Sequence, residues 1–342
     1  SLEEVKANAG GFDDGSIDAV NYLRSIDTLF YRVEKDYASG TSEHRSLNDP
    51  QVQGYFGTAS YSSFNQRNYI RFLEGTGVIQ VGNETRTRWA PGLARRPILQ
   101  TLASVKYYLS KPQRNRYLIG NMAKKIHTIK GIDVMLSRFQ LPLGFTYDSY
   151  ITREDYDIVK QNFLEMQDYF NKLNNYYRQQ VELKNKSELS KEDLKKVENE
   201  LRRLNQKMFI PQIDILMLKG AVIDQESEHF KNFSKGLEKL NPADTVEGFN
   251  ITEYTELVNK LKQDTLAIEK QSMSYFEGHI SVDKRKMLFF SIPYDIGWRA
   301  KVDGKNVQTE RVNIGLTGIM LEPGTHHVIL EYIPPYFKAS LW

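Results

Sequence analysis

The sequence predicts an α+β protein with a mixed N-terminal region, a helical middle segment and a C-terminal antiparallel β-sandwich. Residues 1–150 mix helix-like and strand-like spacing, and residues 151–275 repeat apolar side chains at steps of three and four. Residues 276–342 change to a period of two. These are the spacings of an amphipathic helix and of a half-buried strand. We therefore expect three regions, with the last one a small sandwich.

The N-terminal region is expected to alternate helices and strands. Ser16 can cap a helix that runs to about Ile26, and the alternating segment Phe30–Tyr37 predicts a strand. Apolar spacing predicts a second helix over Ser63–Glu74, which two glycines end. The remaining expected elements are a short helix over Pro97–Ala103 and strands at Val105–Leu109, Tyr117–Ile119 and Val134–Phe139.

The middle region predicts a long helical hairpin and a shorter helix. Thr152 with Asp155 opens a helix whose apolar stripe continues to Leu173, and Ser190 opens a second one. Asn250 marks the start of a third helix. The simplest packing buries one apolar stripe of each helix in an antiparallel arrangement.

The C-terminal region predicts short strands joined by tight turns. Asp303-Gly304 is a strong hairpin signal, because glycine accepts the positive φ of a type I′ turn. We expect Pro293–Asp295 to form a turn and Trp298 to fill the sandwich core. The strand candidates are FEGHISV, KMLFFSIP, WRAKV, IGLTGIMLE and HHVILEY.

Composition excludes several classes of function. The chain has 46 Lys and Arg against 43 Asp and Glu, so its net charge of +3 gives no reason to expect a nucleic-acid partner. It has no cysteine, which excludes disulfides, thiolate metal sites and cysteine nucleophiles. No apolar run approaches the roughly 18 residues of a membrane span, so we expect a soluble region.

No motif in the sequence carries catalytic chemistry. There is no GxSxG, no glycine-rich phosphate loop and no HExxH. Glu226, Glu228 and His229 lie close together, but their spacing is not that of a helical zinc site. His326 and His327 open a strand, so their rings point to opposite faces. We therefore expect no catalytic residue, no metal and no cofactor in this chain.

Two clusters are candidates for binding. Small polar residues interleave with aromatic ones over residues 54–65, a pattern that suits sugar rings and equally suits the edge of a core. A second cluster places arginines around a tryptophan, which suits a phosphate or sugar-phosphate and equally a solvated basic loop. The carbohydrate-binding candidates are Tyr55, Phe56, Tyr61, Phe64 and Trp89, and the phosphate-binding candidates are Arg86, Arg88, Arg95 and Arg96.

The C-terminal motifs resemble a known family. A strand that ends in PYD-GW, a DGK hairpin, a glycine-rich strand, a PxGxH turn and a YxPP exit resemble the extracytoplasmic region of the YfhO family of bacterial membrane proteins. The residues are Pro293, Tyr294, Asp295, Gly297, Trp298, Asp303, Gly304, Lys305, Gly315, Gly318, Pro323, Gly324, His326, Tyr332, Pro334 and Pro335. Weaker similarities lie within residues 16–151, and the helical middle matches only in position.

The resemblance implies a multi-span membrane protein similar to the GT-C class of lipid-linked-sugar glycosyltransferases, and it links the family to glycosylation of cell-surface polymers. It also implies that the sandwich, residues 276–342, leads to the point where the chain enters the membrane. The chain would be its ectodomain on the extracytoplasmic face, next to its own flanking transmembrane helices. No segment matches the catalytic loop of that class, so no catalytic residue is carried over. We expect the fragment to be inactive alone and to support the binding of an acceptor, a glycan or a lipid-linked sugar. The alternative is a structural ectodomain that docks a cell-envelope partner.

Overall fold

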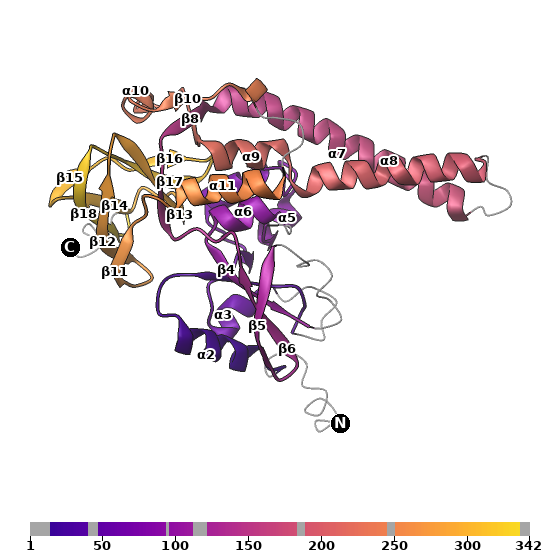
Figure 1. Ribbon diagram of the computed structural model, residues 1–342, viewed down its shortest axis with the longest axis horizontal. Helices are drawn as coiled ribbons and strands as arrows, with labels where there is room; N and C mark the ends of the chain where they lie inside the picture. The colour runs from indigo at the N-terminus through magenta and orange to yellow at the C-terminus, as the bar shows by residue number, and fades with distance from the viewer. Residues whose placement is uncertain are drawn as a thin grey trace.

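Three large β-sheets, a two-stranded sheet and a group of helices form the part of the protein that the computed structural model describes, residues 14–39, 47–93, 96–111, 122–182, 189–244 and 250–335. Helices lie mainly in the middle of the chain and an antiparallel sheet lies near its C-terminal end, which confirms the α+β class. Figure 1 shows the β-rich end, the helical centre and a long helical arm.

A four-stranded sheet lies in the N-terminal region beside the helix α2 (Ser16–Ile26). The cap of this helix differs from the prediction by one residue. Gly15 stands at the N-cap with φ 87°, while the hydroxyl groups of Ser16 and Tyr37 lie 2.6 Å apart in the interior. The strands, in sheet order, are β1 (Arg32–Lys35), β4 (Val105–Ser110), β6 (Ile132–Ser137) and β5 (Ala123–Ile129). The strand expected at 117–119 lies outside the described residues.

Short elements connect β1 to β4. The helix predicted over Ser63–Glu74 is shorter than expected, because α4 begins at Arg67, after Gln66 caps it by accepting from the Tyr69 amide at 2.7 Å. In chain order the elements are α3 (Asp49–Gln53), β2 (Ala59–Tyr61), α4 (Arg67–Gly75), α5 (Glu84–Arg88), β3 (Trp89–Pro91) and α6 (Pro97–Leu102).

A seven-stranded sheet, called the central sheet below, packs on helices with one face and on a five-stranded sheet with the other. The strands at one edge pair in parallel and the others are antiparallel. This sheet takes strands from all three predicted regions, so the boundaries at residues 150 and 275 do not separate its strands. In sheet order they are β10 (Glu238–Lys239), β8 (Ser149–Thr152), β9 (Ala221–Ile223), β16 (Glu310–Val312), β17 (Leu316–Leu321), β13 (Lys286–Pro293) and β7 (Gly144–Tyr147).

A five-stranded antiparallel sheet packs on β13 and β17 and completes the expected sandwich. Trp298 is 7% exposed in the apolar layer between the two sheets, as predicted. Tyr332 packs against it, with ring centroids 5.2 Å apart. The predicted hairpin turn is also present, with φ 51° at Asp303 and 76° at Gly304. The strands, in sheet order, are β11 (Ala267–Gln271), β12 (Tyr275–Val282), β18 (Gly324–Tyr332), β14 (Trp298–Val302) and β15 (Lys305–Val307).

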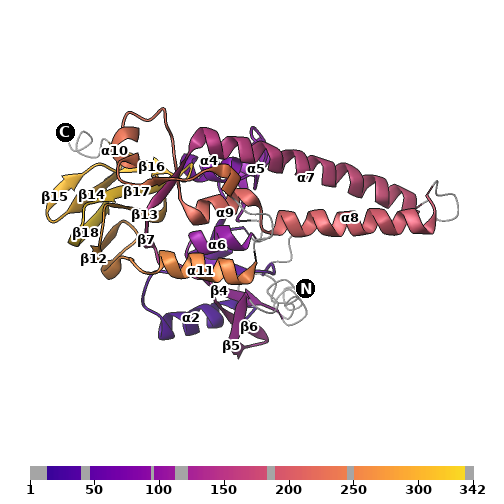
Figure 2. The ribbon, with the colours of Figure 1, turned by 45° about the horizontal axis from the view of Figure 1, so that its top comes forward.

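Two long helices project from the body as an arm. Figures 1 and 2 both show α7 (Arg153–Glu182) and α8 (Lys191–Phe209) side by side and extending away from the sheets. They form the predicted hairpin, and Ser190 caps α8 by accepting from the Asp193 amide at 3.1 Å. Shorter helices lie near the base of the arm or beside the sheets. They are α9 (Gln212–Lys219), α10 (Phe230–Ser234), the 3₁₀ turn η3 (Pro242–Asp244) and α11 (Ile251–Leu261).

Candidate functional site

The segment between α3 and α4, residues 54–66, forms one wall of a cavity of about 350 Å³. The opposite wall includes Arg32 at the start of β1, and Ser291 and Pro293 near the end of β13. This volume lies within the range of about 300–1,000 Å³ that is typical of small-molecule sites. Phe64 lines the cavity and is 94% exposed, so we call it the Phe64 cavity.

Side-chain amides hold the cavity segment in place. Asn65 donates from Nδ2 to the Thr87 carbonyl at 2.8 Å, which ties the segment to α5. Gln66 donates from Nε2 to the Tyr294 carbonyl at 2.8 Å, which ties it to the turn after β13. These contacts explain why a loop rich in glycine and serine has a defined shape. They also leave hydroxyl and amide groups of several residues lining the cavity: Gln51, Ser60, Ser62, Asn65 and Gln66.

Arg32 supplies a positive charge to the opposite wall. Its guanidinium donates to the Ala103 carbonyl at 2.7 Å and to the hydroxyl and carbonyl oxygens of Ser291 at 3.0 and 2.7 Å. These acceptors are neutral, so only the nearby Glu34 carboxylate offsets part of the positive charge of Arg32. Burial lowers the pKa of Arg32 to about 10, so the group remains charged at neutral pH.

Glu34 lies on the same face of β1 as Arg32, two residues along the strand. Burial raises the pKa of Glu34 to about 7, although the Thr58 hydroxyl donates to its carboxylate and Arg32 attracts it. Thr58 itself lines the Phe64 cavity. A carboxyl group that changes charge near neutral pH therefore lies behind the cavity wall.

The predicted aromatic candidates take different positions. Phe64 lines the cavity, whereas Phe56 packs on Phe30 with ring centroids 5.0 Å apart. Tyr61 pairs with Trp89, with centroids 4.5 Å apart. Tyr55 is half-buried against the N-terminal core, and burial raises its pKa. The structure thus brings one of these five side chains into the cavity lining that we describe.

The described arginines of the predicted phosphate-binding cluster lie in different surroundings. Arg86 and Arg88 lie on α5, while Arg95 lies outside the described residues. Arg96 is 6% exposed, and its Nε donates to Asp214 Oδ2 at 2.8 Å while Nη2 pairs with the other carboxylate oxygen. Asp214 is fully buried. Arg96 is thus already paired in the interior, and we do not retain it as a phosphate ligand.

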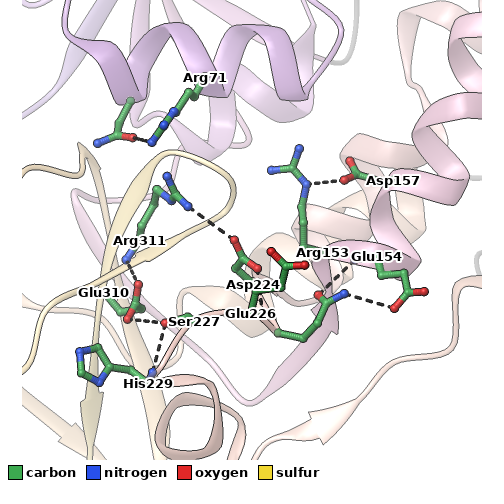
Figure 3. A network of polar contacts seen from close by, with 12 residues as sticks. Arg71, Arg153, Glu154, Asp157, Asp224, Glu226, Ser227, His229, Glu310 and Arg311 are labelled. Carbon is green, nitrogen blue, oxygen red and sulfur yellow. Dashed lines mark hydrogen bonds and ion pairs between the residues drawn. The ribbon is translucent and has the colours of Figure 1, made fainter.

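A separate polar network joins the start of α7, the loop after β9 and β16, and Arg71 of α4 lies nearby (Figure 3). Arg311 lies 3.5 Å from Asp224, and Arg153 Nε donates to Asp157 at 2.7 Å. The Ser227 hydroxyl donates to Glu310 at 3.0 Å. Gln225, in the loop after β9, accepts from the Glu154 amide at 3.3 Å and donates to the Glu154 carboxylate at 3.2 Å, so the network connects the start of the arm to the sheet.

The histidines that the sequence singled out have local partners. His229 lies 3.4 Å from Glu228, and His326 contacts Asp303 through Nδ1 at 2.8 Å. His327 contacts Glu277 at 3.0 Å instead, so the two neighbouring rings have different partners, as expected of adjacent strand residues. Within the described ranges, no group of three histidine or acidic side chains is arranged to hold a metal ion.

Sequence reasoning missed Arg32 and Glu34. Both lie in a strand predicted only from its alternation, and they come close to Thr58 and Ser291 through tertiary contacts. A charged pair on one face of a short strand was the signal available in the sequence.

Comparisons with known proteins give the family of the chain. The family described as "Bacterial membrane protein YfhO" matches residues 13–215 and 238–342, so the match includes most of the helical middle. The chain is also 35% identical over 111 residues to the "Uncharacterized protein YfhO" of Bacillus subtilis (strain 168). That match covers 32% of this chain and 12% of the relative. Across the described ranges, no helix is long and apolar enough to cross a membrane. The chain belongs to the YfhO family of bacterial membrane proteins.

Proposed function

We propose that this chain is an extracytoplasmic domain of a multi-span membrane protein that transfers sugars to cell-surface polymers. In this proposal the Phe64 cavity binds part of the sugar or of the acceptor, and the chemistry takes place elsewhere in the protein. Membership of a membrane-protein family supports the setting. The composition of the Phe64 cavity supports the binding role.

The lining of the Phe64 cavity suits a carbohydrate. Sugar rings bind where an apolar surface lies next to amide and hydroxyl groups. Phe64 offers the apolar surface, and Asn65 and Gln66 contribute amides to the same lining. The guanidinium of Arg32 adds a positive charge, and its N–H groups can donate hydrogen bonds to sugar hydroxyls or to an acidic substituent.

An NMR titration tests this proposal. We expect methyl glycosides of glucose, galactose or N-acetylglucosamine to shift backbone amides of residues 57–66 and 291–292. Binding of about 1 mM corresponds to about −4 kcal/mol. Phe64→Ala removes the exposed ring and should weaken binding at least fivefold.

The matched control is Val81→Ala, which truncates another exposed apolar side chain outside the cavity lining. It should leave the titration unchanged. Shifts that map instead to Arg86 and Arg88, or that persist at full affinity in Phe64→Ala, would exclude the Phe64 cavity as the site.

The projecting arm supports a second candidate function, the docking of a cell-envelope protein. Ile158, Tyr169 and Tyr176 are 60%, 50% and 39% exposed along α7. Cross-linking of the full-length protein in cells tests this role. A photo-reactive residue at position 169 should capture a partner, and one at position 305 on β15 should not.

A further inference from the structure

A second cavity of about 550 Å³ lies on the other side of the wall that contains Arg32. Residues 140–143 and 265–268 line it, together with Phe30. Ser104 lines this cavity and Ser291 lines the Phe64 cavity, and their hydroxyl oxygens are 2.8 Å apart. The two cavities are therefore neighbours that share a thin polar partition.

Most of the second cavity is apolar. Leucine and proline side chains form much of the lining, and the aromatic ring of Phe30 adds to it. Leu29 is 58% exposed at the same site, so apolar surface continues from the lining to the outside. The apolar lining residues are Leu29, Phe30, Leu141, Pro142, Leu143, Leu266, Ala267 and Ile268. An aliphatic chain would gain free energy by burial here.

Two lysines give this cavity a net positive charge. Lys106 pairs with Asp27 at 2.5 Å. Lys262 has no acidic partner in the part of the chain that the structure describes, and burial lowers the pKa of its ammonium group. The two cations and one carboxylate leave a single positive charge. A ligand group with one negative charge, such as a carboxylate, matches it.

A buried hydrogen-bond acceptor in this cavity favours a ligand that carries a hydrogen-bond donor. Gln140 lines the cavity, and its Oε1 atom is buried without a hydrogen-bond partner among the described residues. Because leaving a buried acceptor without a donor costs free energy, a ligand whose hydroxyl donates to it should bind more tightly.

We propose that this second cavity, the Lys262 cavity, binds a small amphiphile that has one carboxylate, an aliphatic chain and a hydroxyl donor. The carboxylate pairs with Lys262, the hydroxyl donates to Gln140 and the chain lies against the leucines. This site is distinct from the carbohydrate cavity, and its ligand is independent of the proposed sugar-binding role.

Isothermal titration with three matched probes tests the proposal. We expect decanoate to bind, and decanol and acetate to bind at least tenfold more weakly, because each lacks one of the two main features. We expect 3-hydroxydecanoate to bind about threefold more tightly than decanoate. That difference should disappear in Gln140→Leu.

Two variants and one control locate the site. Lys262→Met should weaken the binding of decanoate at least tenfold. Ala267→Trp should block the cavity and prevent binding. Lys305→Met removes an exposed lysine outside the cavity and should bind like the wild type. Circular dichroism checks that each variant is folded. Equal affinity for decanoate and decanol, or full affinity in folded Lys262→Met and Ala267→Trp, would overturn the proposal.

Discussion

At the residue scale, some charged side chains of this protein are paired in the interior, whereas others form ion pairs at the surface. Arg96 and Asp214 are 118 positions apart in the sequence and form a bidentate ion pair in the interior. Burial raises the pKa of Asp214, while the neighbouring guanidinium opposes that rise. Such a pair positions the elements that carry it, because either charge alone would be costly to bury.

Asp214→Asn should therefore destabilise the protein strongly. It leaves the guanidinium of Arg96 buried without a counter-charge, and we expect a loss of about 3–5 kcal/mol in the free energy of unfolding. Urea denaturation measures this loss. The control Glu200→Gln removes an exposed ion pair with Arg203 and should cost less than about 1 kcal/mol. Similar small losses in both variants would contradict this account of the buried pair.

Glu34 should make stability depend on pH. Burial raises the pKa of Glu34 from 4.5 to about 7, so the folded protein binds this proton more tightly than the unfolded chain does. Its contribution is fully present below pH 4.5 and is lost as the pH rises through about 7. Glu34→Gln should show less loss of stability between about pH 5 and about pH 8 than the wild type.

Thermal unfolding across that pH range measures the effect, and Glu84→Gln on the exposed face of α5 is the control. Parallel pH profiles for the wild type and Glu34→Gln would show that Glu34 titrates alike in both states.

At the element scale, caps and turns decide where helices and strands end. Asn250 accepts from the amides of Thr252 and Glu253 at 2.9 and 3.0 Å, and α11 then buries Tyr254, Val258 and Leu261. Asn250→Ala should cost about 1 kcal/mol of stability, because two amides lose their acceptor. Chemical denaturation measures it. Asn171→Ala, at an exposed position inside α7, is the control and should have almost no effect.

The sandwich depends on one large side chain. Trp298 on β14 lies between the two sheets and contacts both Phe276 and Tyr332. Trp298→Ala should lower the free energy of unfolding by about 3–5 kcal/mol. The control Lys301→Ala changes an exposed position on the same strand. An unchanged melting temperature in Trp298→Ala would mean that the ring is not part of the core.

Local signals in the sequence predicted many of these helices, strands and turns. They could not predict which distant segments of the chain pair with one another. Ser190 and Asn250 mark helix starts by their own side chains, and Asp303-Gly304 marks a turn by its backbone preference. In contrast, α9 is buried on nearly all sides, so it has no amphipathic period to recognise. The partners in the Phe64 cavity come from β1, the loop before α4 and β13, and no local pattern connects them.

At the scale of the whole molecule, the central sheet joins regions that look separate in the sequence. β16 from the third region lies in its middle, next to β9 from the second region, and β7 from the first region lies at one edge. The sandwich core likewise includes Leu143 and Leu266, which precede the C-terminal region. A C-terminal region cut at residue 276 would lack both residues.

An isolated fragment of residues 276–342 should therefore not fold. It lacks β7 at one edge, β9 at the other side of β16, and β11 in the facing sheet. We expect a poorly dispersed NMR spectrum and no cooperative thermal transition, with the complete chain as the control. A dispersed spectrum from the fragment would show that it is an independent domain.

The order of strands in the central sheet also has a consequence for biosynthesis. β9 pairs with β16 through Val312 and Ile223, so its neighbour emerges from the ribosome long after β9 does. Until then the edge of β9 that pairs with β16 in the folded protein has no partner strand. The main hydrophobic core also stays incomplete, because it includes residues of the last third of the chain. The core of this domain therefore cannot be completed before residues 310–312 have been synthesised, and the nascent chain needs protection from aggregation during that interval.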